Sequence, residues 1–306
     1  MKQLLVIIIS LLATRGSSSG VTSLKEPSEF KKIVTSDYEL YIPSNDVKSI
    51  LVLFGGFPED AIAIQKEFKI LDKALEQEIA VLFMNFNRKL WLSPEHKVVL
   101  SSILNRAFED NELPADNIVI GGFSSGGNVS LLLANYLVQN NDSVQPNGVF
   151  NVDSPVDLLQ LYRLAKKNIE RNYSESSIQE GNMLVNIFEN EFDLPKYGIG
   201  QYELCSPYTS ETHNIDNIAA LDGVKLRFYT EPDTEWWKSN KNIDPEDLNA
   251  HWISILAKEL REKWKNTFIE LITTENKGYR SNGMRHPHSW SIIDQDDLIN
   301  WILSKE

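Results

Sequence analysis

One serine in the sequence has the surroundings of a nucleophile. Ser124 is the third residue of the segment GFSSG at 122–126, which follows the apolar run 118–121 and precedes a helical pattern at 128–137. This order predicts a strand, a sharp turn and a helix, and the flanking glycines leave space for a strained turn that exposes the hydroxyl. The N-terminal amides and dipole of the helix then point toward the oxyanion that forms when a serine attacks a carbonyl carbon.

Two histidines are suitably placed to act as the base for such a serine. His286 and His288 lie in the segment RHPHSW, in a predicted loop between the last strand and the last helix, where a side chain can turn toward the serine without disturbing the core. The other histidines, His96, His213 and His251, lie earlier in the chain or inside a predicted amphipathic helix. The residues alone therefore leave His286 and His288 as alternatives.

Two acids follow a predicted strand at the edge where the base must be oriented. Glu231 and Asp233 come directly after the strand 226–230, and an acid at a strand end is well placed to hold a catalytic histidine. A role in a turn or as a helix cap explains these two residues equally well. Trp236 and Trp237 come next, and we expect their indoles either to line a substrate pocket or to pack in the core.

A glycine turn supplies candidate donors for the oxyanion. The apolar run 51–54 ends in Gly55-Gly56-Phe57-Pro58, so backbone N–H groups reach the end of an early strand. Glycine pairs are common in turns. This pair follows a strand that precedes the serine segment, and this position makes the turn a candidate source of oxyanion donors.

The composition restricts the class of protein. The 306 residues with 42% hydrophobic content are enough for one large core, and a net charge of −13 without a cluster of Lys or Arg argues against a nucleic-acid partner. Cys205 is the only cysteine, and no CxxC or HExxH spacing indicates a metal site. We therefore expect no bound metal and no cofactor.

The N-terminus has the proportions of a signal peptide. Lys2 precedes an apolar segment of about ten residues, which is too short to span a bilayer, and a polar stretch follows. We expect residues 1–23 to comprise a signal peptide, of about residues 1–20, and a disordered junction, with cleavage between Ala13 and Ser23. This predicts a secreted or periplasmic protein with no stable membrane insertion. The alternative is a buried N-terminal strand.

The remaining chain, residues 27–306, alternates predicted strands and helices. Apolar runs typical of strands buried on both faces alternate with helical patterns, an order that implies a mostly parallel sheet with right-handed crossovers. The predicted strands are 33–42, 49–54, 79–84, 118–123, 148–152, 225–229 and 267–271, and the predicted helices are 61–75, 98–108, 128–138, 247–264 and 297–303. We expect a single α/β domain with a doubly wound sheet.

One crossover is much longer than the others. About seventy residues separate the strand that ends near Asp153 from the one that begins near Lys225, whereas a crossover needs about a dozen. Apolar residues at helical spacing predict a small helical cap at about 156–206, above the carboxyl ends of the strands, where ligands bind in open α/β sheets. The alternative is an insertion packed against an edge of the sheet.

The order of these parts resembles that of the α/β-hydrolases. From 31 to 304, an oxyanion turn, a GxSxG segment, a cap, an acid and a histidine follow one another as in that family. The resemblance implies that Ser124 is the nucleophile and that the backbone amides of Phe57 and Ser125 bind the oxyanion. Gly55 stands where many members have a histidine, a difference that leaves the backbone donor in place.

The resemblance also selects the acid. The segment 230–233 resembles the family's Gly-x-x-Asp at the end of its penultimate strand, which selects Asp233 over Glu231. Some members place the acid one strand earlier, and Asp153 is then the candidate.

The histidine is selected in the same way. The segment 288–290 resembles the His-Ser-aromatic run of several esterase branches, which selects His288 over His286.

The resemblance implies an exported serine hydrolase that cleaves a carboxylic ester through an acyl-enzyme intermediate. The expected substrate is a small-molecule or carbohydrate-linked ester. A small serine peptidase or amidase on the same fold is the main alternative, because the same three residue types cleave amides. A non-catalytic binding protein is a further alternative, since a fold does not by itself establish a function.

Overall fold

A single sheet organises the chain. The structure, a computed structural model, describes residues 6–7, 29–86, 89–265 and 268–304. Within these ranges the strands are β1 (Val6–Ile7), β2 (Phe30–Val34), β3 (Tyr38–Pro43), β4 (Ser49–Phe54), β5 (Ile79–Met84), β6 (Ile118–Phe123), β7 (Gly148–Val152), β8 (Lys225–Thr230) and β9 (Ile269–Thr273). Their order in the sheet is β1-β2-β3-β5-β4-β6-β7-β8-β9.

The sheet is antiparallel at one edge and parallel elsewhere. The pairs β1·β2, β2·β3 and β3·β5 are antiparallel, and the strands from β5 to β9 pair in parallel. Every residue of β4, β5, β6, β7 and β8 is buried. Burial on both faces explains why these strands are continuous apolar runs in the sequence rather than alternating ones.

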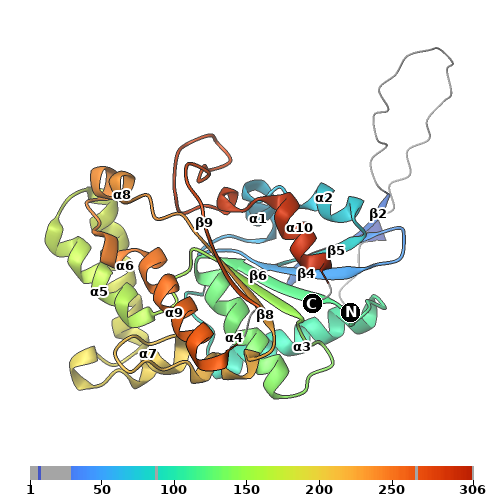
Figure 1. Cartoon of the computed structure of the whole chain (residues 1–306), viewed down its shortest axis with the longest axis horizontal. Coiled ribbons are helices and arrows are strands. Elements are labelled where there is room, and N and C mark those ends of the chain that lie inside the picture. The colour runs from blue at the N-terminus through green and yellow to red at the C-terminus, as the bar shows by residue number, and fades with distance from the viewer. Residues whose placement is uncertain (1–5, 8–28, 87–88, 266–267, 305–306) are drawn as a thin grey trace, which may run out of the picture.

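Helices cover both faces of the sheet (Figure 1). They are α1 (Ala61–Glu67), α2 (Leu71–Glu76), α3 (Pro94–Asp110), α4 (Ser125–Gln139), α5 (Leu158–Arg171), α6 (Glu175–Glu191), α7 (Gly200–Cys205), α8 (Thr234–Lys241), α9 (Asn249–Trp264) and α10 (Gln295–Leu303). One apolar core joins the sheet to α3, α4 and α9, and a second joins its other face to α1, α2 and α10. The predicted doubly wound, mostly parallel α/β fold is confirmed.

Two predicted elements are each divided by a short interruption. The strand expected at 33–42 is instead the hairpin of β2 and β3, because Thr35 Oγ1 accepts hydrogen bonds from the N–H groups of Asp37 and Tyr38, at 3.1 and 3.0 Å, and closes a turn. The helix expected at 61–75 is divided into α1 and α2. Residues 35–37 are polar, and the prediction of one strand rested on the apolar residues on either side of them.

The long connection between β7 and β8 contains a separate group of helices. The helices α5, α6 and α7 all lie inside the range 156–206 predicted for a cap, and they gather at one end of the sheet together with α8 (Figure 1). They share a small apolar core of their own, made of Leu158, Leu159, Tyr162, Phe188, Phe192, Tyr202 and Cys205.

The N-terminal segment is described only in part. β1 pairs with β2, in the register Val6 with Ile33. The rest of the predicted signal peptide and junction, at 1–5 and 8–23, lies outside the described residues. None of the described helices is both long and apolar enough to cross a membrane.

Candidate active site

Ser124 lies at a strained turn between β6 and α4. Its backbone has φ 54° and ψ −128°, and its N–H donates to the carbonyl of Val152 at 2.9 Å. A Cβ added at Gly122 would lie 2.2 Å from the carbonyl oxygen of Gly126, and one at Gly126 would lie 2.3 Å from that of Phe54. Only glycine fits at either position, and the close approach of α4 to the sheet holds the serine at the carboxyl end of β6.

His288 connects Ser124 to an acid. Its Nε2 lies 3.1 Å from Ser124 Oγ, and its Nδ1 lies 2.7 Å from Asp153 Oδ2. Because a carboxylate only accepts hydrogen bonds, Nδ1 carries the proton, and Nε2 is free to accept the proton of the serine hydroxyl. The ring of His288 lies against that of Phe123, with 4.4 Å between centroids. Ser124, His288 and Asp153 therefore form one chain of hydrogen bonds.

Asp153 is positioned by two strands and a helix. It follows β7 directly, with φ 44°, and its N–H donates to the carbonyl of Tyr229 in β8 at 2.8 Å. The side-chain amide of Asn249, the first residue of α9, donates to the carbonyl of Asp153 at 2.8 Å. These bonds hold a buried carboxylate beside His288.

Asp233, which the sequence selected as the acid, is used elsewhere. Its Oδ1 accepts from the N–H of Trp236 at 3.0 Å and caps α8, and its Oδ2 accepts from Arg285 Nη2 at 2.6 Å. The structure thus gives His288 the partner Asp153, one strand earlier, and the choice of Asp233 is corrected accordingly. The physical reason is that α8 begins immediately after β8, so the acid at this strand end satisfies the free amides of the helix.

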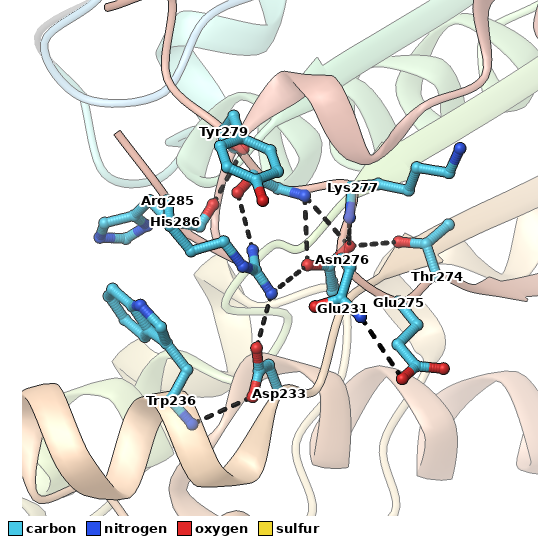
Figure 2. A network of polar contacts seen from close by, with 12 residues as sticks. Glu231, Asp233, Trp236, Thr274, Glu275, Asn276, Lys277, Tyr279, Arg285 and His286 are labelled. Carbon is cyan, nitrogen blue, oxygen red and sulfur yellow. Dashed lines mark hydrogen bonds and ion pairs between the residues drawn. The ribbon is translucent and has the colours of Figure 1, made fainter. Parts of the chain in front are cut away.

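Glu231, the other acid at this strand end, holds the loop that carries the histidines (Figure 2). Its carboxylate is buried, pairs with Arg285 Nη2 at 2.6 Å, and accepts hydrogen bonds from the backbone N–H groups of Lys277 and Gly278 at 2.9 and 3.1 Å. Arg285 also donates to the carbonyl of Gly278 at 2.7 Å. Neither Glu231 nor Asp233 forms a hydrogen bond with His288 in the described structure.

His286 lies beside the hydrogen-bonded chain rather than in it. Its Nδ1 donates to the carbonyl of His288 at 3.0 Å, so it supports the backbone of the residue that contacts Ser124. The ring lies 5.0 Å from that of Trp236 and 5.6 Å from that of Trp237, between centroids. Burial, and to a smaller extent the nearby charges of Arg280 and His288, lowers the pKa of His286 to about 3.

The turn after β4 presents one amide beside the serine. The N–H of Phe57 donates to Ser125 Oγ at 2.9 Å, whereas the N–H of Gly56 donates to Glu59 Oε2 at 3.0 Å. The same carboxylate oxygen accepts from Trp290 Nε1 at 3.0 Å. Glu59 therefore stabilises this turn through its hydrogen bond with Gly56. Phe57 is the residue whose amide faces the start of α4. Burial raises the pKa of the Glu59 carboxyl.

A cavity of about 680 Å³ opens over Ser124 and His288. Its lining includes Phe57, Ser125 and residues of α5 and α6. Trp237 belongs to the lining, whereas Trp236 packs against His286 instead. The volume is in the range of about 300 to 1,000 Å³ that small-molecule sites occupy.

No cluster of three or more His, Cys, Asp or Glu side chains suited to a metal ion occurs among the described residues. Cys205 is buried in the small core of α5 to α7, and burial raises the pKa of its thiol to about 11.

Several residues that build this site had no signal in the sequence. Glu59, Asn249 and Arg285 act through contacts between segments far apart in the chain, and neither spacing nor residue type marks them. The proximity of Arg285 to both histidines in the sequence was the single available indication.

The sequence matches no protein-family model and no curated protein. The fold, in contrast, is similar to that of many solved structures. The chain matches FphF, a fluorophosphonate-binding serine hydrolase of Staphylococcus aureus, with a TM-score of 0.53 and 12% identity over 92% of this chain and 96% of that one.

Two fungal esterases are also similar. Carboxyl esterase 2 of Tuber melanosporum matches with a TM-score of 0.54 and 14% identity over 94% of this chain and 88% of that one. A Rhizomucor miehei esterase matches with a TM-score of 0.50 and 12% identity over 91% of this chain and 79% of that one. The protein therefore has the α/β-hydrolase fold, as its sequence motifs indicated.

The low pKa of His286 predicts a specific dependence of stability on pH. Between pH 6.5 and about 3, His286 stays neutral in the folded protein but binds a proton in the unfolded chain, so the free energy of unfolding should fall as the pH decreases through this window. His286→Asn keeps a donor near the position of Nδ1 and removes the titration. Urea unfolding at pH 7, 6, 5 and 4 should show a smaller loss of stability for this variant than for the wild type.

Asn300, which is exposed on α10, provides the control. Asn300→Gln neither adds nor removes a titratable group and should retain the wild-type dependence on pH. An identical slope for His286→Asn and the wild type would contradict the assignment.

Proposed function

We propose that the protein is a serine hydrolase that cleaves a carboxylic ester through an acyl-enzyme intermediate. The observation that carries this proposal is the chain of hydrogen bonds from Ser124 through His288 to Asp153 at the floor of a cavity. A nucleophile within reach of a base that an acid orients is the arrangement that acyl transfer requires.

The geometry supports a defined role for each residue. His288 Nε2 accepts the proton of Ser124 Oγ as that oxygen attacks the carbonyl carbon of the substrate. Asp153 holds the ring in the correct tautomer and stabilises the imidazolium that forms. His288 then returns the proton to the leaving alcohol. Water, activated by the same histidine, hydrolyses the acyl-enzyme and restores the serine.

The backbone amides of Phe57 and Ser125 are the proposed oxyanion donors. Ser125 is the first residue of α4, so its N–H lies at the positive end of the helix dipole. The N–H of Phe57 is occupied by Ser125 Oγ, and this bond fixes the direction of the amide. An oxyanion has to share this amide with Ser125 Oγ or replace the hydroxyl as its acceptor.

An ester is favoured over an amide because similar structures with TM-scores of 0.50 or more include proteins named as esterases. The same three side chains are compatible with amide hydrolysis. A panel of 4-nitrophenyl esters and aminoacyl anilides separates the two activities.

The proposed nucleophile predicts the outcome of covalent labelling. A fluorophosphonate probe should label Ser124, and Ser124→Ala should lose the label together with roughly 10⁴ to 10⁶ of ester turnover, because no other group can form the acyl-enzyme. Ser125→Ala serves as the matched control and should still be labelled, since it retains both the nucleophile and its own backbone amide. Labelling that persists in folded Ser124→Ala would place the nucleophile elsewhere.

The two candidate acids predict different losses of activity. Asp153→Asn should lower ester turnover by roughly 10⁴, because an amide favours the wrong tautomer of His288. Asp233→Asn should cost far less turnover and act mainly on the melting temperature, since Asp233 binds α8 and Arg285. Kinetics and thermal unfolding of both variants distinguish lost chemistry from lost folding. The reverse order of turnover losses would restore Asp233 as the acid.

We further propose that the protein is exported. Lys2, the apolar segment after it and the polar stretch that follows support this proposal. Mature protein purified from its natural compartment should begin between Thr14 and Leu24, as N-terminal sequencing would show. An intact Met1 on the soluble cytoplasmic protein would refute export.

A further inference from the structure

The cavity contains one arginine whose side-chain N–H groups are unused among the described residues. Arg280 lines the cavity together with Ser124 and His288, and its guanidinium forms no hydrogen bond or ion pair among the residues that the structure describes. The side chains of the other described arginines each have such a bond, namely Arg106, Arg163, Arg171, Arg227, Arg261 and Arg285. The donors of Arg280 are therefore available to a ligand.

The guanidinium of Arg280 lies against Phe123, the ring that also contacts His288. Its Cζ lies 5.7 Å from the ring centroid of Phe123, and the ring of Phe123 lies 4.4 Å from that of His288. A cation over an aromatic face is held in place while its N–H groups remain unused. Arg280 and His288 thus lie against the same aromatic ring, and both line the cavity.

The loop that carries Arg280 is anchored on both sides. The N–H of Arg280 donates to the carbonyl of Met284 at 2.9 Å, and the N–H of Ser281 donates to Glu67 at 3.0 Å. Arg285 ties the same loop to Glu231 (Figure 2). The backbone that carries the guanidinium is therefore held before a ligand enters, which reduces the entropy lost on binding.

The acids near Arg280 already have other partners. Glu59 and Glu67 interact with its charge but form no ion pair with it, and their oxygens accept hydrogen bonds from Gly56 and Ser281. Within the cavity, Asp153 is bound to His288.

The remaining acids of the cavity lining do not compensate Arg280 either. Glu231 pairs with Arg285, Asp247 pairs with Lys167 and Arg171, and Glu180 is exposed on α6. Lys241, also in the lining, adds a second positive charge near His286. A protein with a net charge of −13 therefore presents to its candidate substrate site two cations, Arg280 and Lys241, that form no ion pair with any described residue.

We propose that Arg280 binds a carboxylate of the substrate, so that the preferred ester is a monoester of a dicarboxylic acid. This inference rests on the proposed ester hydrolysis and names its substrate class. The planar guanidinium matches a carboxylate with two parallel N–H···O bonds. An anionic group held beside His288 would place the ester carbonyl of a short diacid over Ser124.

The test compares two esters with the same acyl chain length. Mono-4-nitrophenyl glutarate carries the carboxylate, and 4-nitrophenyl pentanoate lacks it. Arg280→Gln should lower the ratio of kcat/KM for glutarate to that for pentanoate at least about tenfold, because a charged, partly desolvated hydrogen bond is lost. Arg280→Lys, which keeps the charge and loses the fork, should give an intermediate ratio.

Arg106→Gln is the matched control, because it removes one positive charge from the exposed face of α3, outside the cavity. It should leave the ratio and both activities unchanged. Melting temperatures of all variants establish that they are folded. A ratio that does not change in Arg280→Gln, with both esters affected equally or not at all, would overturn the carboxylate site while leaving ester hydrolysis intact.

A binding measurement separates this inference from the proposed reaction. Calorimetry of monomethyl glutarate with Ser124→Ala, alone and combined with Arg280→Gln, requires no turnover. The second change should weaken binding at least about tenfold. Failure of the wild type to hydrolyse either ester would refute the proposed function, and an affinity that is unaffected by Arg280→Gln, or no binding at all, would refute the carboxylate site.

Discussion

The candidate site depends on the ion pairs of Arg285. This guanidinium joins the acids that follow β8 to the loop that carries His288, and the amides of that loop bind the buried carboxylate of Glu231. A buried ion pair is strong only where further hydrogen bonds satisfy both partners, and this condition is met here. Because the same loop also carries Arg280, this anchor contributes to the placement of both a proposed base and a proposed substrate contact.

The parts of the fold that the sequence predicted are those that local patterns encode. The buried strands are continuous apolar runs. Gly122 and Gly126 mark the turn at Ser124, because no larger residue fits at either position. The hairpin in place of the strand at 33–42 was missed because the prediction rested on the apolar residues on both sides of residues 35–37, whereas the polar residues between them form a turn closed by Thr35. Such a turn is specified by side-chain hydrogen bonds, which have no hydrophobic period.

The choice of acid shows where local patterns fail. Asp153, Glu231 and Asp233 all follow strands whose carboxyl ends meet at one edge of the sheet. They differ in the partner that the fold brings to each carboxylate. Asp153 contacts His288, and Glu231 contacts Arg285. Asp233 contacts Arg285 and also caps the first turn of α8. The sequence predicted Ser124 and His288 as a pair, and the structure brings these two side chains together. The local sequence patterns did not show which of the three acids would be free to contact His288.

The separate core of α5, α6 and α7 has a consequence for how this protein can vary. Phe188, Tyr202 and their neighbours pack mainly on one another rather than in either core of the sheet. Substitutions among these side chains can therefore alter one wall of the cavity without loss of the packing that holds Ser124, Asp153 and His288. The side chains behind the wall of a proposed binding cavity can thus change while the packing beneath its proposed reactive floor stays the same.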